Sequence, residues 1–291
     1  STGGKDSSAE TGNPRNSIAI PKYKIVTLDE NLDFGASTAS LAKKYGADVA
    51  SAVQDEWALD QLGKVQQEKQ KHPGVALMLS IGGWTRSQMF HEMASTPANR
   101  KVFIDSCVEF LKDFPGFDGI DLDWEYPGVA RSGSGSDQGN PVKGDDFNNY
   151  TALLREMRQA FDAEFGVGAK KLTVCSAVGV STIVKQDVAA FAPYVDLINI
   201  MSYDMTASYD RVTGHHAALY NSNPNGHSTE KGVQYYLSKG VPASKINIGT
   251  PLYCHGWGNV SPDANGNVVG VSGSNRGYAG DMNWKVLKGF E

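Results

Sequence analysis

The sequence predicts an α/β fold in which helices cover a parallel β-sheet, and two observations lead to that prediction. Short apolar runs that have the composition of strands alternate along the chain with stretches that have the periodicity of amphipathic helices. The apolar runs are nearly continuous instead of alternating in polarity, which is typical of parallel strands buried on both faces. The length of 291 residues, 40% of them hydrophobic, suits one large domain with a sizeable core.

The N-terminal part of the chain gives the weakest strand signals. Residues 1–17 are rich in Ser, Gly, Asn and charge, and we predict a mobile tail there, followed by a single domain over residues 18–291. Residues 18–28 have the composition of a strand, but Pro21 interrupts them. The first clear strand covers residues 75–81 and ends at Gly82-Gly83.

Strands and helices alternate through the rest of the chain. Apolar residues at helical spacing predict helices over residues 99–111, 147–161 and 228–239. Strands are predicted around the acidic run at 117–127 and over residues 172–178, 195–203 and 246–253. Residues 131–144 are rich in Gly and Ser and predict a surface loop. After Trp257 the chain is rich in Gly and Asn, so residues 258–291 are a candidate small insertion.

Charge and cysteine content exclude several classes of function. The net charge of −5 and the pI near 5.7 give no basic surface for nucleic acid. No apolar run reaches the ~18 residues that a membrane span needs, and no signal peptide is recognised in the sequence. The three cysteines (Cys107, Cys175 and Cys254) lie far apart and lack C-x-x-C spacing, so the chain does not require an oxidising compartment.

The most informative segment is residues 117–127, which reads F-D-G-I-D-L-D-W-E-Y-P. Because side chains alternate between the faces of a strand, Asp121, Asp123 and Glu125 are expected to share one face, roughly 6–7 Å apart. Carboxylates this close resist ionising together, so at least one pKa is expected to rise. A carboxylic acid that stays protonated near neutral pH can act as a general acid.

A row of acids such as this one has two other interpretations. A row of acids can bind Ca²⁺ or Mg²⁺ through oxygen ligands, or it can be a solvated strand edge. The edge interpretation is weak because Ile120, Leu122 and Trp124 fill the opposite face. The metal interpretation is weaker than the general acid because the aromatic and proline residues around Glu125 favour a neutral carboxyl.

The run D-G-I-D-L-D-W-E resembles the D-x-x-D-x-D-x-E signature of the family 18 glycoside hydrolases, the chitinases and their relatives. The flanking Phe117 and Tyr126-Pro127 are also similar to that family. Further motifs follow in the family's order, so the resemblance covers about residues 18–257.

The resemblance implies a (β/α)₈ barrel with its catalytic residues at the C-terminal ends of strands. The third through the seventh strands can be matched, whereas the first one or two and the eighth are not identified. In the family, a tryptophan on the last strand forms the floor of the sugar site. That tryptophan is not assigned in this sequence, and Trp284 is a poor candidate. We therefore expect either a fragment of a longer protein or a barrel with unusual ends.

The resemblance also implies hydrolysis of β-1,4 bonds between N-acetylglucosamine units, with retention of configuration and with assistance from the substrate's own acetamido group. Glu125 is expected to protonate the leaving oxygen and later to activate water. Asp123 is expected to orient the acetamido group and to share a proton with Asp121. Asp118 is expected on the opposite face of the strand from these three acids, and its role is expected to be structural. No cofactor or metal is implied.

Two more motifs carry expected substrate contacts. Residues 80–85 (S-I-G-G-W-T) look like the family's S-x-G-G, in which glycines allow close backbone approach. Residues 201–204 (M-S-Y-D) resemble M-x-Y-D, which implies that the Tyr203 hydroxyl holds the acetamido oxygen. The expected substrate contacts from these motifs and from the acidic run are Gly82, Gly83, Trp84, Thr85, Tyr126, Met201 and Asp204, with Ser80 as part of the motif.

Residues 253–257 (Y-C-H-G-W) sit where relatives often show Y-G-R-x-W. Tyr253 matches and is expected to contact substrate. His255 replaces a common arginine, and it is either a pH-dependent sugar contact or a surface histidine. A metal site at His215, His216 and His227 is not expected, because adjacent strand histidines point apart and no nearby acid or cysteine completes the set.

We therefore predict an extracellular, endochitinase-like enzyme that acts as a monomer on chitin or N-acetylglucosamine oligosaccharides, with no nucleic-acid or membrane partner. One alternative is an endo-β-N-acetylglucosaminidase acting on N-glycans, which shares the acidic signature. The other is a non-catalytic chitinase-like module that binds glycan without turnover. The intact Glu125 argues against that module, whereas the unassigned strands argue for it.

Overall fold

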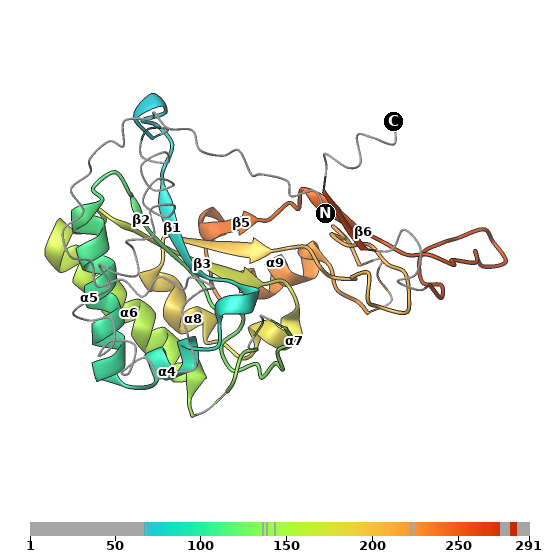
Figure 1. Ribbon diagram of the computed structural model, residues 1–291, viewed down its shortest axis with the longest axis horizontal. Helices are drawn as coiled ribbons and strands as arrows, with labels where there is room; N and C mark the ends of the chain where they lie inside the picture. Colours follow the sequence, from blue (N-terminus) through green and yellow to red (C-terminus); the bar gives the residue numbers. More distant parts are fainter. Residues whose placement is uncertain are drawn as a thin grey trace, which may run out of the picture.

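The computed structural model describes residues 67, 69–135, 137, 139–142, 144–221, 223, 225–273 and 280–283 (Figure 1). The predicted N-terminal tail, the candidate strand at residues 18–28 and Trp284 lie outside the described residues.

A parallel sheet of five strands forms the centre of the described part. The strands are β1 (Met78–Gly82), β2 (Gly119–Asp123), β3 (Lys171–Ala177), β4 (Leu197–Met201) and β5 (Ile246–Ile248). Each strand pairs with the next one along the chain, so the order in the sheet is the order in the sequence. This is the connectivity of a (β/α)₈ barrel, and the five strands are the ones that were matched from the sequence as the third to the seventh.

Helices connect the strands and cover one face of the sheet (Figure 1). The α-helices are α4 (Phe90–Ser95), α5 (Pro97–Asp113), α6 (Asp146–Phe165), α7 (Val180–Ile183), α8 (Val188–Phe191) and α9 (Thr229–Ser238), and the 3₁₀ turns are η1 (Trp84–Arg86), η2 (Ala192–Tyr194) and η3 (Ala243–Lys245). Side-chain caps start the three longest helices: Thr96, Asp145 and Ser228 each accept a hydrogen bond from a backbone N–H in the first turn. The predicted helices at 99–111, 147–161 and 228–239 correspond to α5, α6 and α9.

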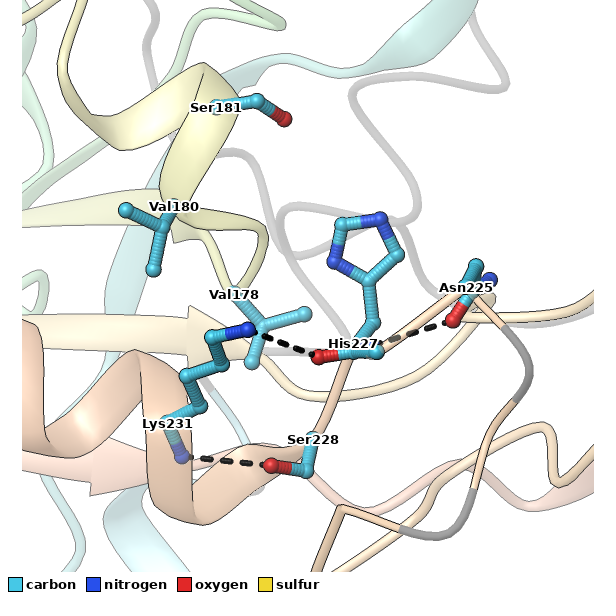
Figure 2. Close-up of a pocket in the computed structure, with 8 residues that line it drawn as sticks. Val178, Val180, Ser181, Asn225, His227, Ser228 and Lys231 are labelled. Atoms are coloured by element: carbon cyan, nitrogen blue, oxygen red, sulfur yellow. Dashed lines mark hydrogen bonds between the residues drawn. The ribbon is translucent and has the colours of Figure 1, made fainter.

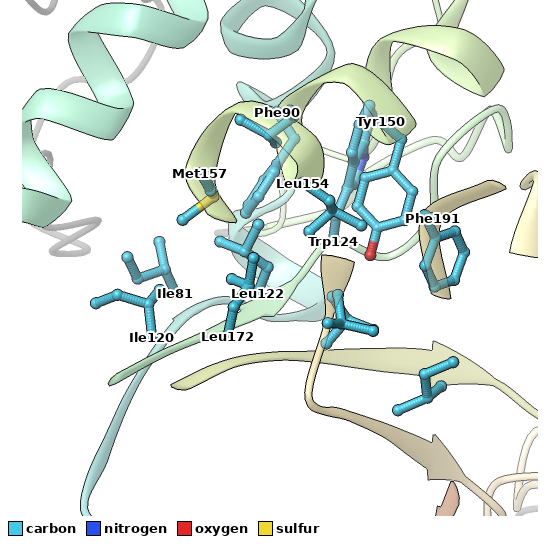
Figure 3. Packing of buried hydrophobic residues seen from close by; sticks show 14 of the residues in the cluster. Ile81, Phe90, Ile120, Leu122, Trp124, Tyr150, Leu154, Met157, Leu172 and Phe191 are labelled. Atoms are coloured by element: carbon cyan, nitrogen blue, oxygen red, sulfur yellow. The ribbon is translucent and has the colours of Figure 1, made fainter. Parts of the chain in front are cut away.

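The core lies between the sheet and the helices that cover it, and Figure 3 shows the part of it beside α4, α6 and α8. Ile120 and Leu122 of β2 are fully buried, and Trp124 follows them into the core. Phe90 stacks on the Trp124 ring with 5.5 Å between centroids, and Tyr150 meets that ring edge-on at 5.7 Å. Aromatic pairs of this kind contribute about 0.5–1.5 kcal/mol beyond the burial of their area. These contacts fix the even-numbered residues of the acidic run in the core and leave the odd-numbered acids on the other face.

The predicted strand at 246–253 is wrong as one element. β5 stops at Ile248, and a separate strand β6 (Tyr253–Gly256) pairs antiparallel with β7 (Gly280–Asn283). Pro251 lies between β5 and β6 and has no N–H to donate to a sheet ladder. The apolar run alone could not show that its two halves have different partners.

The predicted surface loop at 131–144 is more closely tied to the core than its composition suggested. Arg131 and Asn140 form an antiparallel bridge, and the Asn140 side chain is fully buried. Its Oδ1 accepts from the Trp124 indole at 3.0 Å, and its Nδ2 donates to the carbonyls of Tyr126 and Val129. Asn140 therefore holds the segment that follows β2, where Glu125 lies.

Within the part of the chain that the structure covers, no helix combines the length and the apolar character that crossing a membrane would require.

Candidate active site

The three acids of the signature gather at the C-terminal end of β2. Asp121 and Asp123 lie in the strand, and Glu125 lies two residues beyond its end, so the expectation that Glu125 belongs to the strand is wrong by two residues. Asp121 is 7% exposed and Glu125 is 8% exposed, whereas Asp123 is only partly buried. The carboxyl ends of parallel strands meet at one edge of the sheet, and this is where the (β/α)₈ fold places catalytic groups.

Asp121 is held by donors from three other strands of the sheet. The Ser80 hydroxyl of β1 donates to Oδ2 at 2.8 Å, and the Asn199 amide of β4 donates to Oδ1 at 3.1 Å. From β3, the Thr173 hydroxyl donates to Oδ1 and the Cys175 thiol lies 3.3 Å from Oδ2. All four groups direct hydrogen bonds at one side chain, so Asp121 acts as an acceptor with a fixed orientation.

Asp123 stands between Asp121 and the mouth of the site. Burial and the charge of Asp121 raise the pKa of Asp123 to about 6. Its Oδ1 is buried and has no hydrogen-bond partner among the residues that the structure describes. A buried carboxylate oxygen of this kind is costly unless it accepts a hydrogen bond, so Oδ1 is available to a donor on a bound molecule.

Glu125 has the properties of a general acid. Burial and the neighbouring Asp123 carboxylate raise its pKa to about 7, and Asp204 acts in the same direction, while Tyr126 and Arg131 act against them. The Glu125 backbone N–H donates to the Ser87 hydroxyl at 2.9 Å, and the Glu125–Tyr126 peptide bond is cis. A carboxyl with a pKa near 7 can release and recover a proton at neutral pH.

The two glycines of residues 82–83 let β1 end directly against β2. Gly82 has φ of 118°, and a Cβ built there would lie 2.1 Å from the Asp123 carbonyl oxygen. The Gly83 N–H donates to the same carbonyl at 2.7 Å. The sequence-based expectation of close backbone approach at Gly82 is therefore correct in its geometry, and the partner is the backbone of Asp123.

Trp84 and Thr85 follow the glycines in η1, and both are exposed. The Trp84 side chain is 48% exposed, and the Arg131 guanidinium lies over its ring at 3.9 Å from the centroid. Arg131 also donates to the Trp84 carbonyl and pairs with Asp137. A cation on an aromatic face stabilises the ring's orientation, so Trp84 is an exposed but fixed side chain.

A second group of predicted residues follows β4. Met201 ends the strand, and Tyr203 and Asp204 follow it after Ser202. Burial and nearby acidic groups raise the pKa of Tyr203 to about 12, so its hydroxyl stays protonated and can donate. Asp204 has φ of 54°, and its side chain is 47% exposed. The Tyr203 ring meets the Tyr253 ring edge-on at 6.2 Å.

Asp204 is bonded on both of its carboxylate oxygens. The Tyr253 hydroxyl donates to Oδ2 at 2.6 Å, and His255 Nε2 lies 2.6 Å from Oδ1. The expectation that no acid lies near the histidine pair is wrong, because His216 Nδ1 is 3.5 Å from the same Oδ1. The sequence could not show this contact, since a loop of 11 residues between Asp204 and His216 folds back on itself. His255 is not an isolated surface histidine.

Asp118 lies just before β2, at the opposite end from Glu125. Its Oδ2 accepts from the Leu77 N–H at 2.6 Å and from Lys69 at 2.8 Å. The Lys69 interactions and the bond from Leu77 lower the pKa of Asp118. These contacts join the segments that precede β1 and β2. They support a structural role for Asp118, which was predicted because its side chain faces away from the other three acids.

Sequence reasoning did not identify several residues that shape the site: Ser87, Arg131, Thr173, Cys175 and Asn199. The sequence does contain a signal for the three of these residues that lie on strands. Thr173 and Cys175 alternate with the buried Leu172 and Val174, and Asn199 lies between two buried isoleucines. Polar residues at alternate positions of an otherwise apolar buried strand indicate a polar partner on the inner face.

A pocket of about 200 Å³ lies elsewhere, beside the start of α9 (Figure 2). Its lining comes from the segment after β3 and from residues 225–228 and Lys231. Lys231 points back to the Gly226 carbonyl at 3.3 Å. None of the signature carboxylates lines this pocket, so we place the chemistry at the end of β2 instead.

Comparisons with known proteins identify the family of the chain. Residues 23–288 match the model of the glycosyl hydrolases family 18. Chitinase A1 of Niallia circulans is 34% identical over 271 residues, which are 88% of this chain and 36% of that protein.

Among solved structures, chitinase ChiA74 of Bacillus thuringiensis aligns with a TM-score of 0.67 at 32% identity, over 78% of this chain and 38% of that one. The Ostrinia furnacalis group IV chitinase in complex with allosamidin aligns with a TM-score of 0.68 at 28% identity, over 84% and 66%. The chain thus spans little more than a third of the length of the Niallia circulans and Bacillus thuringiensis chitinases. With the acidic signature in place at the end of β2 and a family match that covers most of its length, the chain belongs to family 18 of the glycosyl hydrolases.

Proposed function

We propose that this chain hydrolyses β-1,4 bonds between N-acetylglucosamine units, as a chitinase, and that Glu125 is its acid. The observation that carries the proposal is the buried Glu125 carboxyl, whose pKa is raised to about 7 beside an Asp123 whose pKa is raised to about 6. Family membership and the chitinase names of the relatives support the same substrate class.

In the first step, Glu125 donates its proton to the oxygen that bridges two sugars. The bond between this oxygen and the anomeric carbon breaks, and one sugar leaves with the proton. The anomeric carbon belongs to the other sugar, whose own acetamido carbonyl oxygen attacks it. The product is a cyclic oxazolinium ion bound to the protein without a covalent link. A second carboxylate nucleophile is not needed, because the substrate supplies the attacking atom.

Asp123 serves the acetamido group in this step. Its buried Oδ1, which lacks a partner among the described side chains and backbone groups, accepts the acetamido N–H. A negative charge there also stabilises the positive oxazolinium ion. Asp121 is fixed by its four donors and maintains the charge that keeps the pKa of Asp123 raised.

Tyr203 positions the attacking oxygen. Its hydroxyl remains protonated because its pKa is raised to about 12, so it donates to the acetamido carbonyl and holds it near the anomeric carbon. Orientation of reacting groups can lower a barrier by several kcal/mol. The same sugar is surrounded by Met201, Asp204 and Tyr253. Sugars further along the polysaccharide contact Trp84, Thr85 and Tyr126, beside the Gly82-Gly83 turn.

In the second step, the Glu125 carboxylate takes a proton from water, and the hydroxide opens the oxazolinium ring at the anomeric carbon. Two displacements at one carbon give net retention. Glu125 ends the cycle protonated, so its pKa must lie near the working pH for both steps to proceed.

The test uses a fluorogenic N-acetylglucosamine oligomer with the unchanged chain and with Glu125→Gln. We expect turnover by the unchanged chain, a loss of at least about a hundredfold in kcat for the variant, and competitive inhibition by a thiazoline that mimics the oxazoline. Binding of the oligomer without turnover in both proteins would contradict the proposal and favour a glycan-binding module. Turnover without thiazoline inhibition would contradict the role of the acetamido group.

The predicted extracellular location remains part of this proposal, because the substrate is an extracellular polymer. The monomeric state and the single-domain organisation over residues 18–291 stay predictions.

A further inference from the structure

Three side chains from three separate segments converge next to the proposed sugar site. Asp204 follows β4, His216 lies in the loop after it, and His255 lies in β6. The carboxylate oxygen and one ring nitrogen from each histidine all lie within 4.8 Å of one another. Nε2 of His255 is 2.6 Å from Asp204 Oδ1, and Nδ1 of His216 is 3.5 Å from it.

This donor set has the chemistry of a zinc site. Zn²⁺ binds imidazole nitrogen and carboxylate oxygen at about 2.0–2.2 Å, which places tetrahedral ligand atoms about 3.3 Å apart. The two distances to Asp204 Oδ1, 2.6 and 3.5 Å, lie on either side of that value, and the two ring nitrogens lie within 4.8 Å of each other. Side-chain rotations therefore suffice to bring the three atoms around one ion. Ca²⁺ and Mg²⁺ prefer oxygen ligands and are disfavoured by two imidazoles.

The surroundings prepare the carboxylate and the rings. The Tyr253 hydroxyl donates to Oδ2 of Asp204 at 2.6 Å, which leaves Oδ1 directed at the histidines. The two imidazole rings meet at 82° with 4.4 Å between centroids. The His255 and His216 side chains are 5% and 13% exposed, whereas Asp204 is 47% exposed. The site is therefore walled by histidines and open on the side of the carboxylate.

Two existing contacts oppose the metal. The Asp204 N–H donates to Nδ1 of His216 at 3.1 Å, so the ion must displace this hydrogen bond. The contact between Nε2 of His255 and Oδ1 of Asp204 at 2.6 Å must also open, because a ring nitrogen binds a metal only without its proton. A divalent charge beside a carboxylate and two neutral imidazoles compensates for the loss of these two hydrogen bonds.

We propose that Asp204, His216 and His255 form a Zn²⁺ site with three protein ligands and a fourth position open to water. The zinc and the sugar compete, because the ion occupies the Asp204 oxygen that would otherwise contact the sugar. This second statement rests on the proposed function; the binding of the metal does not.

The test is titration calorimetry of the full chain with ZnCl₂ at pH 7 in a buffer that does not bind zinc. We compare the unchanged chain with His216→Ala and His255→Gln, and use His215→Ala as the matched control. His215 is adjacent in sequence and exposed, and it is not one of the three ligands. We expect one zinc per chain, an affinity at least about tenfold lower in both ligand variants, and an unchanged affinity in the control.

No zinc binding by the unchanged chain, or equal binding by all four proteins, would overturn the site. The absorption spectrum of the unchanged chain with Co²⁺ keeps the test decisive if a variant fails to fold. Intense visible bands support coordination by nitrogen and oxygen in a four-coordinate site, and their absence contradicts it. Competitive inhibition of oligomer turnover by Zn²⁺ is measured separately, so failure of the chitinase proposal leaves the calorimetric result intact.

Discussion

The backbone N–H of Glu125 donates to the Ser87 hydroxyl at 2.9 Å, and that hydroxyl in turn donates to the Gly83 carbonyl at 2.9 Å. The Ser87 side chain is fully buried. One hydroxyl therefore joins the backbone of Glu125 to the turn that ends β1, and so links the two loops that carry the proposed substrate contacts.

Replacing Ser87 with alanine removes both bonds and leaves the Glu125 N–H buried without its partner. Such a group costs about 1–3 kcal/mol, so we expect Ser87→Ala to lower the free energy of unfolding by that amount in urea titrations. Ser244→Ala, at an exposed position, is the control and should change it by less than about 0.5 kcal/mol. Equal stability of the two variants would show that the Ser87 bonds are not formed.

The activity should have a narrow bell-shaped pH dependence. Glu125 must be protonated to act as the acid, so kcat/KM should fall as pH rises through its pKa of about 7. Asp123 must be ionised to accept the acetamido N–H, so kcat/KM should fall as pH drops through about 6. The two groups are coupled, and the profile reports apparent values for the pair.

The Asp123→Asn variant tests this assignment. Removing the charge that raises the pKa of Glu125 should move the alkaline limb of the residual activity to lower pH. If kcat/KM of the unchanged enzyme fell only above pH 9, Glu125 would not be the acid. The same conclusion would follow if the alkaline fall occurred at the same pH in the unchanged enzyme and in Asp123→Asn.

The strand and helix pattern was predictable because local periodicity determines it. β2 and α6 carry long, unambiguous signals, and the parity of the acidic run correctly separated Ile120 and Leu122 from Asp121 and Asp123. The break between β5 and β6 was not predictable in the same way, because it depends on which strand each half pairs with.

The site was predictable in part for the same reason. A motif contiguous in sequence, such as the acids around β2, can be found from spacing. The contact of Asp204 with His216 and His255 depends on how two loops fold against each other. The donors on β3 and β4 become partners of Asp121 only when the strands align in register.

The buried acid should reduce stability at alkaline pH. The pKa of Glu125 is raised from 4.5 to about 7 by folding, so the folded state binds the proton more tightly than the unfolded chain. This contribution is fully present below pH ~4.5 and is lost as pH rises through about 7. A shift of this size corresponds to at most about 3 kcal/mol.

Glu125→Gln keeps the shape of the side chain and removes the ionisation. We expect the variant to be more stable than the unchanged chain by about 1–3 kcal/mol at pH 8 and equally stable at pH 4. Urea unfolding at a series of pH values measures the difference, and Glu230→Gln, at an exposed position, is the control. A difference that does not depend on pH would show that Glu125 is not desolvated.

The turn at Gly82 should not accept any side chain. Its φ of 118° is unfavourable for other residues, and a Cβ would lie 2.1 Å from the Asp123 carbonyl oxygen and 2.8 Å from its carbon. Both atoms belong to the backbone of β2, which cannot move without shifting the carboxylates that follow. We expect Gly82→Ala to destabilise the protein by about 3 kcal/mol or more. Gly74→Ala is the matched control, because nothing lies within 4 Å of its built Cβ. Thermal unfolding compares the two, and a Gly82→Ala protein as stable as the control would mean that β1 and β2 do not end in contact.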